Sequence, residues 1–168
     1  KGSQANKALI DAVSDMEGVA VFNLYELSQE IAFNVDEWSK IISDASAVIY
    51  QFPFYWMSAP SLLKKWQDEV FTFLSKTPAV AGKSLTVVTT TGSEYEAYRS
   101  GGRNRFTMDE LLRPYQVSAI HSGMSWQTPI VVYGMGTADA GKNIAEGANL
   151  YKQRVEMLIG SSNAGNNW

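Results

Sequence analysis

The stretch AVIYQFPFYWMSAPSLLKKWQDEVF, residues 47–71, decides the fold of this chain. Its first part, residues 47–52, is a continuous apolar run, which is typical of a strand in a parallel sheet whose two faces are both covered. From Pro60 to about Thr72 the pattern favours a helix, and proline suits a first helical turn because its missing N–H costs little there. The corner between strand and helix carries four aromatic residues, Phe52, Phe54, Tyr55 and Trp56. Such corners are normally polar, so these side chains need an explanation.

The rest of the chain alternates between helical and strand patterns. Apolar residues recur at helical spacing in residues 3–16, 34–46, 107–123 and 137–158. Strands are predicted at residues 19–24, 83–91 and 129–135. Capping boxes begin two of the helices, with Asn34 and Glu37 in one and Thr107 and Glu110 in the other, and Pro114 predicts a break. This alternation predicts an α/β fold, an open and mostly parallel sheet with helices on both faces, as a single domain over residues 1–168.

The start of the chain departs from this scheme. The sequence opens directly into a loop and a helix, with no strand before them. In a doubly wound sheet, that loop normally follows the central first strand. Either the sequence lacks its true N-terminus or the sheet prediction is one strand short. The apolar helix faces favour a missing first strand, because they need a full sheet to cover them.

Composition excludes several classes of function. The net charge of −3 gives no electrostatic reason to expect a nucleic-acid partner or an anionic membrane surface. Cysteine is absent and histidine occurs once, which excludes disulfides, thiolate catalysis and zinc sites built from these residues, so no metal is expected. No apolar run approaches about 20 residues and no signal peptide is recognisable, so we expect a cytoplasmic protein.

Three segments follow predicted strands or open a helix at the sheet edge where α/β proteins bind ligands. In the first, Ser3, Gln4 and Asn6 lead into a helix whose free N–H groups favour a phosphate, although Ser3 taken alone is better explained as an ordinary helix cap. The second is the aromatic corner, and the third is a turn of hydroxyls and exposed N–H groups at residues 90–93. A planar aromatic cofactor explains the corner better than core filling does, because corners lie outside the core.

These segments resemble the flavodoxin-like NAD(P)H:quinone oxidoreductases. That family includes bacterial quinone reductases, modulator-of-drug-activity proteins and the ancillary flavoproteins of glutathione-gated potassium efflux. The resemblance extends from Ser3 to about Leu158 and is carried by residues 49–71, 85–98 and 104–126. It implies a flavodoxin-like three-layer α/β/α sandwich with a parallel five-stranded sheet of order 2-1-3-4-5. It also implies non-covalent FMN or FAD, and a homodimer with its active sites at the subunit interface.

The resemblance further implies roles for individual residues. The loop that holds the flavin phosphate is matched by Ser3, Gln4 and Asn6. The segment along the isoalloxazine ring is matched by Pro53, Phe54, Tyr55, Trp56 and Met57. A Thr-Thr-Gly-Gly turn at the ring's pyrimidine edge is matched by Thr90, Thr91, Gly92 and Ser93, with Ser93 in place of the second glycine. Two residues match catalytic positions: Tyr98 lies beside the reacting face, and Asn104 stands where better-studied relatives have a histidine.

Three other residues carry side chains with chemistry of their own. His121, the single histidine, lies near a predicted helix end and is expected to be a surface or capping residue rather than a catalytic one. Arg103 and Arg105 are candidates to receive the 2′-phosphate of NADPH, and the alternative is two solvated loop arginines.

The sequence thus predicts an enzyme that passes a hydride from NAD(P)H through bound flavin to a quinone or similar acceptor, by two-electron ping-pong transfer. The alternative is an ancillary flavoprotein that docks on a potassium-efflux transporter in the membrane, with the same fold and flavin site. An electron-carrying flavodoxin is disfavoured, because those proteins are typically more acidic and have a phosphate loop richer in hydroxyls.

Overall fold

The structure, a computed structural model, describes residues 3–27 and 32–164. Four parallel strands form one sheet within that part of the chain: β1 (Ala47–Pro53), β2 (Ser84–Thr90), β3 (Ser125–Trp126) and β4 (Ile130–Val132). β2 is central, since it pairs with β1 on one side and with both β3 and β4 on the other. Pro129 lies between β3 and β4 and has no N–H to give to a ladder, which accounts for the interruption of this edge.

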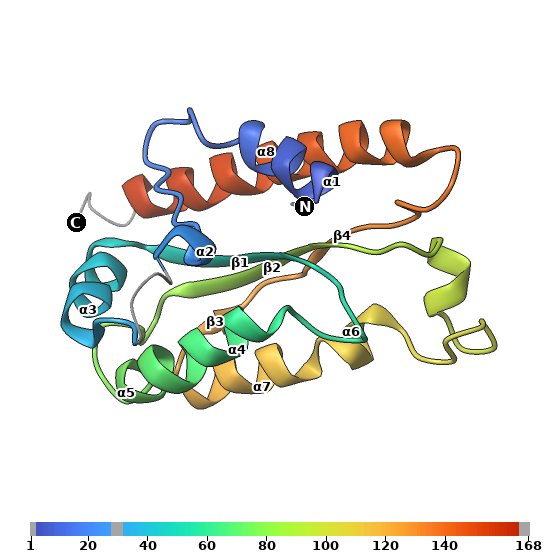
Figure 1. Ribbon diagram of the computed structural model, residues 1–168. Helices are drawn as coiled ribbons and strands as arrows, with labels where there is room; N and C mark the ends of the chain where they lie inside the picture. The colour runs from blue at the N-terminus through green and yellow to red at the C-terminus, as the bar shows by residue number, and fades with distance from the viewer. Residues whose placement is uncertain (1–2, 28–31, 165–168) are drawn as a thin grey trace.

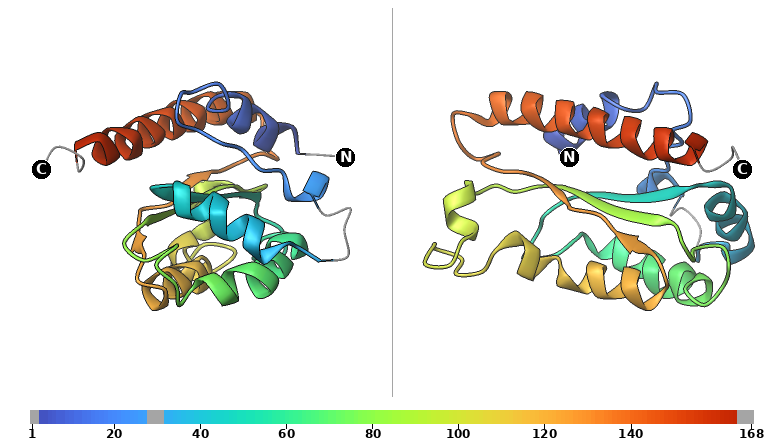
Figure 2. Two further views of the ribbon diagram at one scale, coloured as in Figure 1. Left: turned by 90° about the vertical axis from the view of Figure 1, so that its left-hand side faces the viewer. Right: turned by 180° about the vertical axis from the view of Figure 1, so that it is seen from behind.

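Helices cover both faces of the sheet (Figure 1; Figure 2). One layer holds α1 (Gln4–Asp11) and the long α8 (Ala140–Ala164). The opposite layer holds α4 (Ser61–Trp66), the π-helical η1 (Gln67–Phe71), α5 (Thr72–Leu74) and α7 (Arg113–His121). The remaining helices are α2 (Leu24–Leu27), α3 (Val35–Asp44), the 3₁₀ turn η2 (Tyr95–Tyr98) and α6 (Met108–Leu111). This is the predicted three-layer flavodoxin-like arrangement.

Each face of the sheet has its own apolar core. Tyr50, Phe52 and Val87 pack with the α4 and α7 layer, whereas Val88 packs with α1 and with Tyr151 of α8. Successive strand residues therefore enter opposite cores, which is why the strands read as continuous apolar runs. Burying each large apolar side chain contributes roughly 1.5–3 kcal/mol, so the two cores hold the strand ends at fixed positions.

Most predicted elements are confirmed, with shifted ends. The helix after the aromatic corner forms as α4, η1 and α5 in succession. The capping box of Thr107 and Glu110 is present, and the break expected from Pro114 occurs at Leu112, between α6 and α7. The short strand β3 was not predicted, and α8 continues to Ala164, beyond the expected end.

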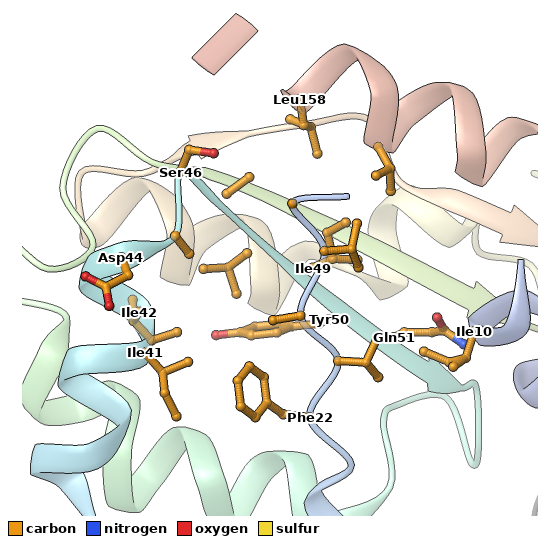
Figure 3. Close-up of a pocket in the computed structure, with 18 of the residues that line it drawn as sticks. Ile10, Phe22, Ile41, Ile42, Asp44, Ser46, Ile49, Tyr50, Gln51 and Leu158 are labelled. Carbon is orange, nitrogen blue, oxygen red and sulfur yellow. The ribbon is translucent and has the colours of Figure 1, made fainter. Parts of the chain in front are cut away.

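The strand expected at residues 19–24 is wrong. Residues 19–23 form no strand, and Leu24 begins α2. A strand needs a ladder partner, and here a cavity of about 600 Å³ lies between this segment and the outer edge of β1 (Figure 3). Its walls include residues 47–51 of β1 and residues 18–22. The described residues therefore show the β1–β2–β3/β4 part of the expected five-strand order and not the rest.

Candidate functional site

Thr90, the last residue of β2, joins the three predicted segments. Its hydroxyl accepts a hydrogen bond from Asn6 Nδ2 at 2.8 Å, and its carbonyl accepts one from the Phe54 N–H at 2.9 Å. Gln51 holds Asn6 from the other side, because its Nε2 donates to the Asn6 carbonyl at 2.8 Å. Since β1 and β2 are parallel, these contacts all lie at the carboxyl end of the sheet (Figure 1). The start of α1, the aromatic corner and the turn after β2 thus meet in one place.

The N-terminus of α1 forms the first wall of the candidate site. Ser3 is its N-cap, and the Ser3 hydroxyl accepts a hydrogen bond from the Asn6 N–H at 3.3 Å. The side chain of Ser3 therefore acts as an ordinary helix cap. Gln4 is exposed in the first turn, where backbone N–H groups have no intrahelical acceptor and attract anions.

The aromatic corner is a strained two-residue turn. Tyr55 and Ser58 exchange backbone hydrogen bonds of 2.7 and 3.0 Å. Trp56 and Met57 between them have φ values of 45° and 61°, a left-handed backbone that costs roughly 1–2 kcal/mol per residue outside glycine. The Trp56 side chain is 86% exposed, so it adds nothing to the core. Strain that holds a bare tryptophan on the surface points to a binding role.

A cluster of tyrosines lies behind the corner. The Tyr98 ring is buried, with its centroid 6.1 Å from that of Phe54 and 5.9 Å from that of Tyr133. Tyr133 also packs edge-on against Tyr95. Burial, helped by the neighbouring Tyr95, raises the pKa of Tyr133 to about 12, so its phenol stays neutral. Sequence reasoning missed Tyr133; its position directly after the last strand was the available signal.

The turn after β2 exposes donors rather than acceptors. The carbonyls of Gly92 and Ser93 accept hydrogen bonds from the N–H groups of Gly136 and Gly134, at 2.9 and 2.8 Å. The Thr91 hydroxyl donates to the Ser93 carbonyl at 2.7 Å, so it serves the turn itself. No described residue accepts from the N–H of Gly92 or Ser93. These two groups are free to bond a ligand.

The loop at residues 99–106 packs tightly against η2. A Cβ on Gly102 would lie 2.2 Å from the Glu96 carbonyl oxygen, so only glycine fits there. Asn104 is anchored by its N–H, which donates to the Ala97 carbonyl at 3.0 Å. Its side-chain Nδ2 is buried and has no hydrogen-bond partner among the described residues. Such a donor costs about 1–3 kcal/mol until a ligand oxygen or a water satisfies it.

Other candidates lie outside this cluster. His121 is exposed in the last turn of α7, as expected for a surface residue. The cavity beside β1 includes none of the predicted site residues among its walls. Within residues 3–27 and 32–164, no group of histidine and acidic side chains is arranged to hold a metal, and no helix is long and apolar enough to cross a membrane.

Several known proteins are similar to this chain in sequence or in fold. KefG of Pectobacterium atrosepticum, the ancillary protein of a glutathione-regulated potassium-efflux system, is 34% identical over 135 residues, which cover 78% of this chain and 74% of KefG. General stress protein 14 from Treponema denticola, crystallised in complex with FMN, matches with a TM-score of 0.83 at 27% identity, over 93% of this chain and 91% of that chain. An NADPH-quinone reductase from P. pentosaceus matches with a TM-score of 0.73 at 25% identity, over 89% of both chains.

A family model described as the flavodoxin-like fold matches residues 1–155. That match spans every strand of the sheet and all three segments of the candidate site. This chain is therefore a member of the flavodoxin-like fold family.

Proposed function

We propose that this chain is a flavin-dependent NAD(P)H oxidoreductase that passes a hydride from NAD(P)H through bound FMN to a quinone or similar acceptor. The observation that carries the proposal is the meeting of three corners at Thr90. FMN in general stress protein 14 and the NADPH-quinone reductase activity named for a second similar structure support the choice of cofactor and substrates.

The chemistry of the site suits a flavin. Ser3, Gln4 and Asn6 would hold the phosphate at the positive end of α1. Residues 53–57 would lie along the ring, since a flat heterocycle gains from contact with exposed aromatic faces. Residues 90–93 would face its pyrimidine edge, where the free N–H groups of Gly92 and Ser93 and the orphaned Asn104 Nδ2 supply donors for ring acceptors.

The flavin, when bound, supplies the two-electron chemistry. The chain binds and orients the reactants and keeps water out of the slot. We assign Tyr98 and Asn104 as the catalytic residues. The ring of Tyr98 is held in a buried aromatic cluster, and its phenol would donate a hydrogen bond to the reactants. Asn104 offers a fixed amide donor where negative charge develops, and such preorganised donors stabilise transition states.

Two kinds of protein partner are compatible with this site. A homodimer would cover the exposed aromatic corner and close the slot from the far side. The similarity to KefG favours a second candidate function, in which the flavoprotein docks on a potassium-efflux transporter from the cytoplasm. Pull-down against such a transporter, beside a quinone assay with the same preparation, separates the two.

The direct test is cofactor capture followed by turnover. We expect the purified chain to bind FMN, to release FMN on boiling, and to oxidise NADPH or NADH over many turnovers when 1,4-benzoquinone is present. Phe73→Ala should leave FMN binding and turnover unchanged, because Phe73 is an exposed aromatic residue on α5, outside the candidate site. A colourless chain that leaves the fluorescence of added FMN and FAD unquenched would refute the proposal.

A further inference from the structure

Arg103 reaches across the candidate site. Its Nη2 donates to the Ser93 hydroxyl oxygen at 2.6 Å, which joins the 99–106 loop to the turn after β2. A hydrogen bond from a guanidinium is charge-assisted and stronger than a neutral one. None of the ion pairs found in the described part of the chain includes Arg103. Arg103 therefore has no ion-pair partner within 4.0 Å in the described part of the chain.

The groups around Arg103 are donors as well. The N–H groups of Gly92 and Ser93 donate to no described acceptor, and Asn104 directly follows Arg103 with its buried, unpaired Nδ2. Gly102 directly precedes it and is packed against the carbonyls of Glu96 and Ala97, so the loop that carries Arg103 has little room to move. A cluster of fixed donors beside one positive charge favours a ligand edge that is rich in acceptors and gains negative charge.

We propose that Arg103, held in place by its hydrogen bond to Ser93, positions a positive charge that makes bound flavin easier to reduce. This inference rests on the function proposed above. The acceptor-rich edge that matches the donor cluster is the pyrimidine edge of the flavin, which becomes more negative on two-electron reduction. A nearby guanidinium then binds the reduced cofactor more tightly than the oxidised one, and this difference raises the midpoint potential.

This role differs from binding the 2′-phosphate of NADPH. The Ser93 hydrogen bond draws the guanidinium onto the turn, toward the cofactor's own edge. A 2′-phosphate contact would change the KM for NADPH and not that for NADH, and would leave the flavin potential unchanged. A redox titration therefore distinguishes the two roles, because only the first changes the flavin potential.

The test is a redox titration of the FMN-loaded protein with indicator dyes, together with the dissociation constant for oxidised FMN. We expect Arg103→Gln to weaken the binding of reduced FMN about tenfold more than the binding of oxidised FMN. This difference lowers the two-electron potential by about 30 mV. Arg103→Lys should recover part of the shift because it keeps the charge. Ser93→Ala should shift the potential in the same direction by less, since it removes the aiming hydroxyl.

Arg113→Gln is the matched control. Arg113 is an exposed arginine that hydrogen-bonds Gln116 on α7, outside the site, and should leave the potential unchanged. An Arg103→Gln potential equal to that of the wild type, with FMN still bound, overturns the inference and leaves the proposed function intact. A changed KM for NADPH alone overturns it in favour of the 2′-phosphate role. A wild-type chain that binds no flavin overturns both proposals.

Discussion

Trp56 and Met57 occupy the two central positions of a turn in which both residues have positive φ. Asn-Gly is the sequence that such a turn prefers. We therefore expect the double change Trp56→Asn with Met57→Gly to raise the stability of the flavin-free protein by roughly 1–2 kcal/mol, by relieving strain. The same change should weaken FMN binding roughly threefold to tenfold, because the stacking surface is lost. Urea denaturation and FMN titration measure the two effects.

The two outcomes are separable. Phe73→Asn removes another exposed aromatic side chain, from α5, and should leave FMN affinity unchanged. A stabilised turn variant that binds FMN as tightly as the wild type would show that the corner is not a flavin wall.

Tyr98 combines two roles that one substitution separates. Its ring packs between Phe54 and Tyr133, and Phe keeps that ring. We expect Tyr98→Phe to slow flavin reduction by NADPH on the order of tenfold to hundredfold, since a preorganised donor is lost, with little change in FMN affinity. Stopped-flow absorbance measures the rate. Tyr151→Phe is the control, because Tyr151 is a buried tyrosine in the other core. Equal rates for Tyr98→Phe and the wild type would reduce Tyr98 to a packing residue.

At the scale of elements, the N-terminal cap of α6 is sensitive to pH. The backbone N–H and then the hydroxyl of Thr107 donate to the Glu110 carboxylate, each at 2.8 Å, and these bonds lower the pKa of Glu110. A carboxyl whose pKa is lower in the folded state stabilises the fold above its unfolded pKa and loses that contribution as pH falls through the folded value.

We therefore expect wild type to exceed Glu110→Gln in Tm at pH 7, with the gap closing as pH falls to 3. Thermal melts of both proteins across that range measure it. A gap that stays constant with pH would show that the capping contribution does not depend on the charge of Glu110.

The outer edge of β1 has no strand paired with it among the described residues. The Phe54 N–H bonds Thr90, so the alternation of a parallel strand turns the backbone groups of Ile49 and Gln51 away from β2, toward the cavity. We expect the amides of Ile49 and Gln51 in this 168-residue chain to exchange with solvent on the order of a hundredfold faster than that of Val88. Amide exchange followed by NMR measures this. Equal protection would mean that the edge of β1 is paired.

These elements show what sequence can predict. β1 and β2 were predictable because burial on both faces leaves an unbroken apolar run. Residues 19–24 have the same kind of run, but local pattern carries no information on whether a ladder partner lies beside them. β3 was missed because two residues are too few to make a pattern.

At the scale of the whole molecule, the meeting of the three segments that form the candidate site was predictable, and the hydrogen bonds that join them were not. Parallel strands deliver their carboxyl ends to one edge, so the corners after β1 and β2 had to be neighbours. The Asn6–Thr90 hydrogen bond links residues 84 positions apart, and the Arg103–Ser93 bond depends on the path of a loop. Both are set by tertiary geometry, which residue spacing does not encode.

The exposed aromatic surface makes a prediction about assembly. Monomeric proteins rarely expose a large apolar patch without a partner. In this chain Tyr55, Trp56 and Met57 of the corner are all exposed, and so is Phe106. We expect the FMN-loaded chain to sediment as a homodimer at micromolar concentration. Phe106→Glu should weaken the dimer about tenfold or more, because a charge buried without a partner is costly.

Leu150→Glu is the matched control for this prediction. Leu150 is an exposed apolar residue on α8, in the opposite helical layer, so a charge there should leave the dimer unchanged (Figure 1). Sedimentation velocity across a concentration series distinguishes the variants. If the wild type stays monomeric throughout while it still binds FMN, the exposed corner serves the flavin alone, and each site must work without a second subunit to close it.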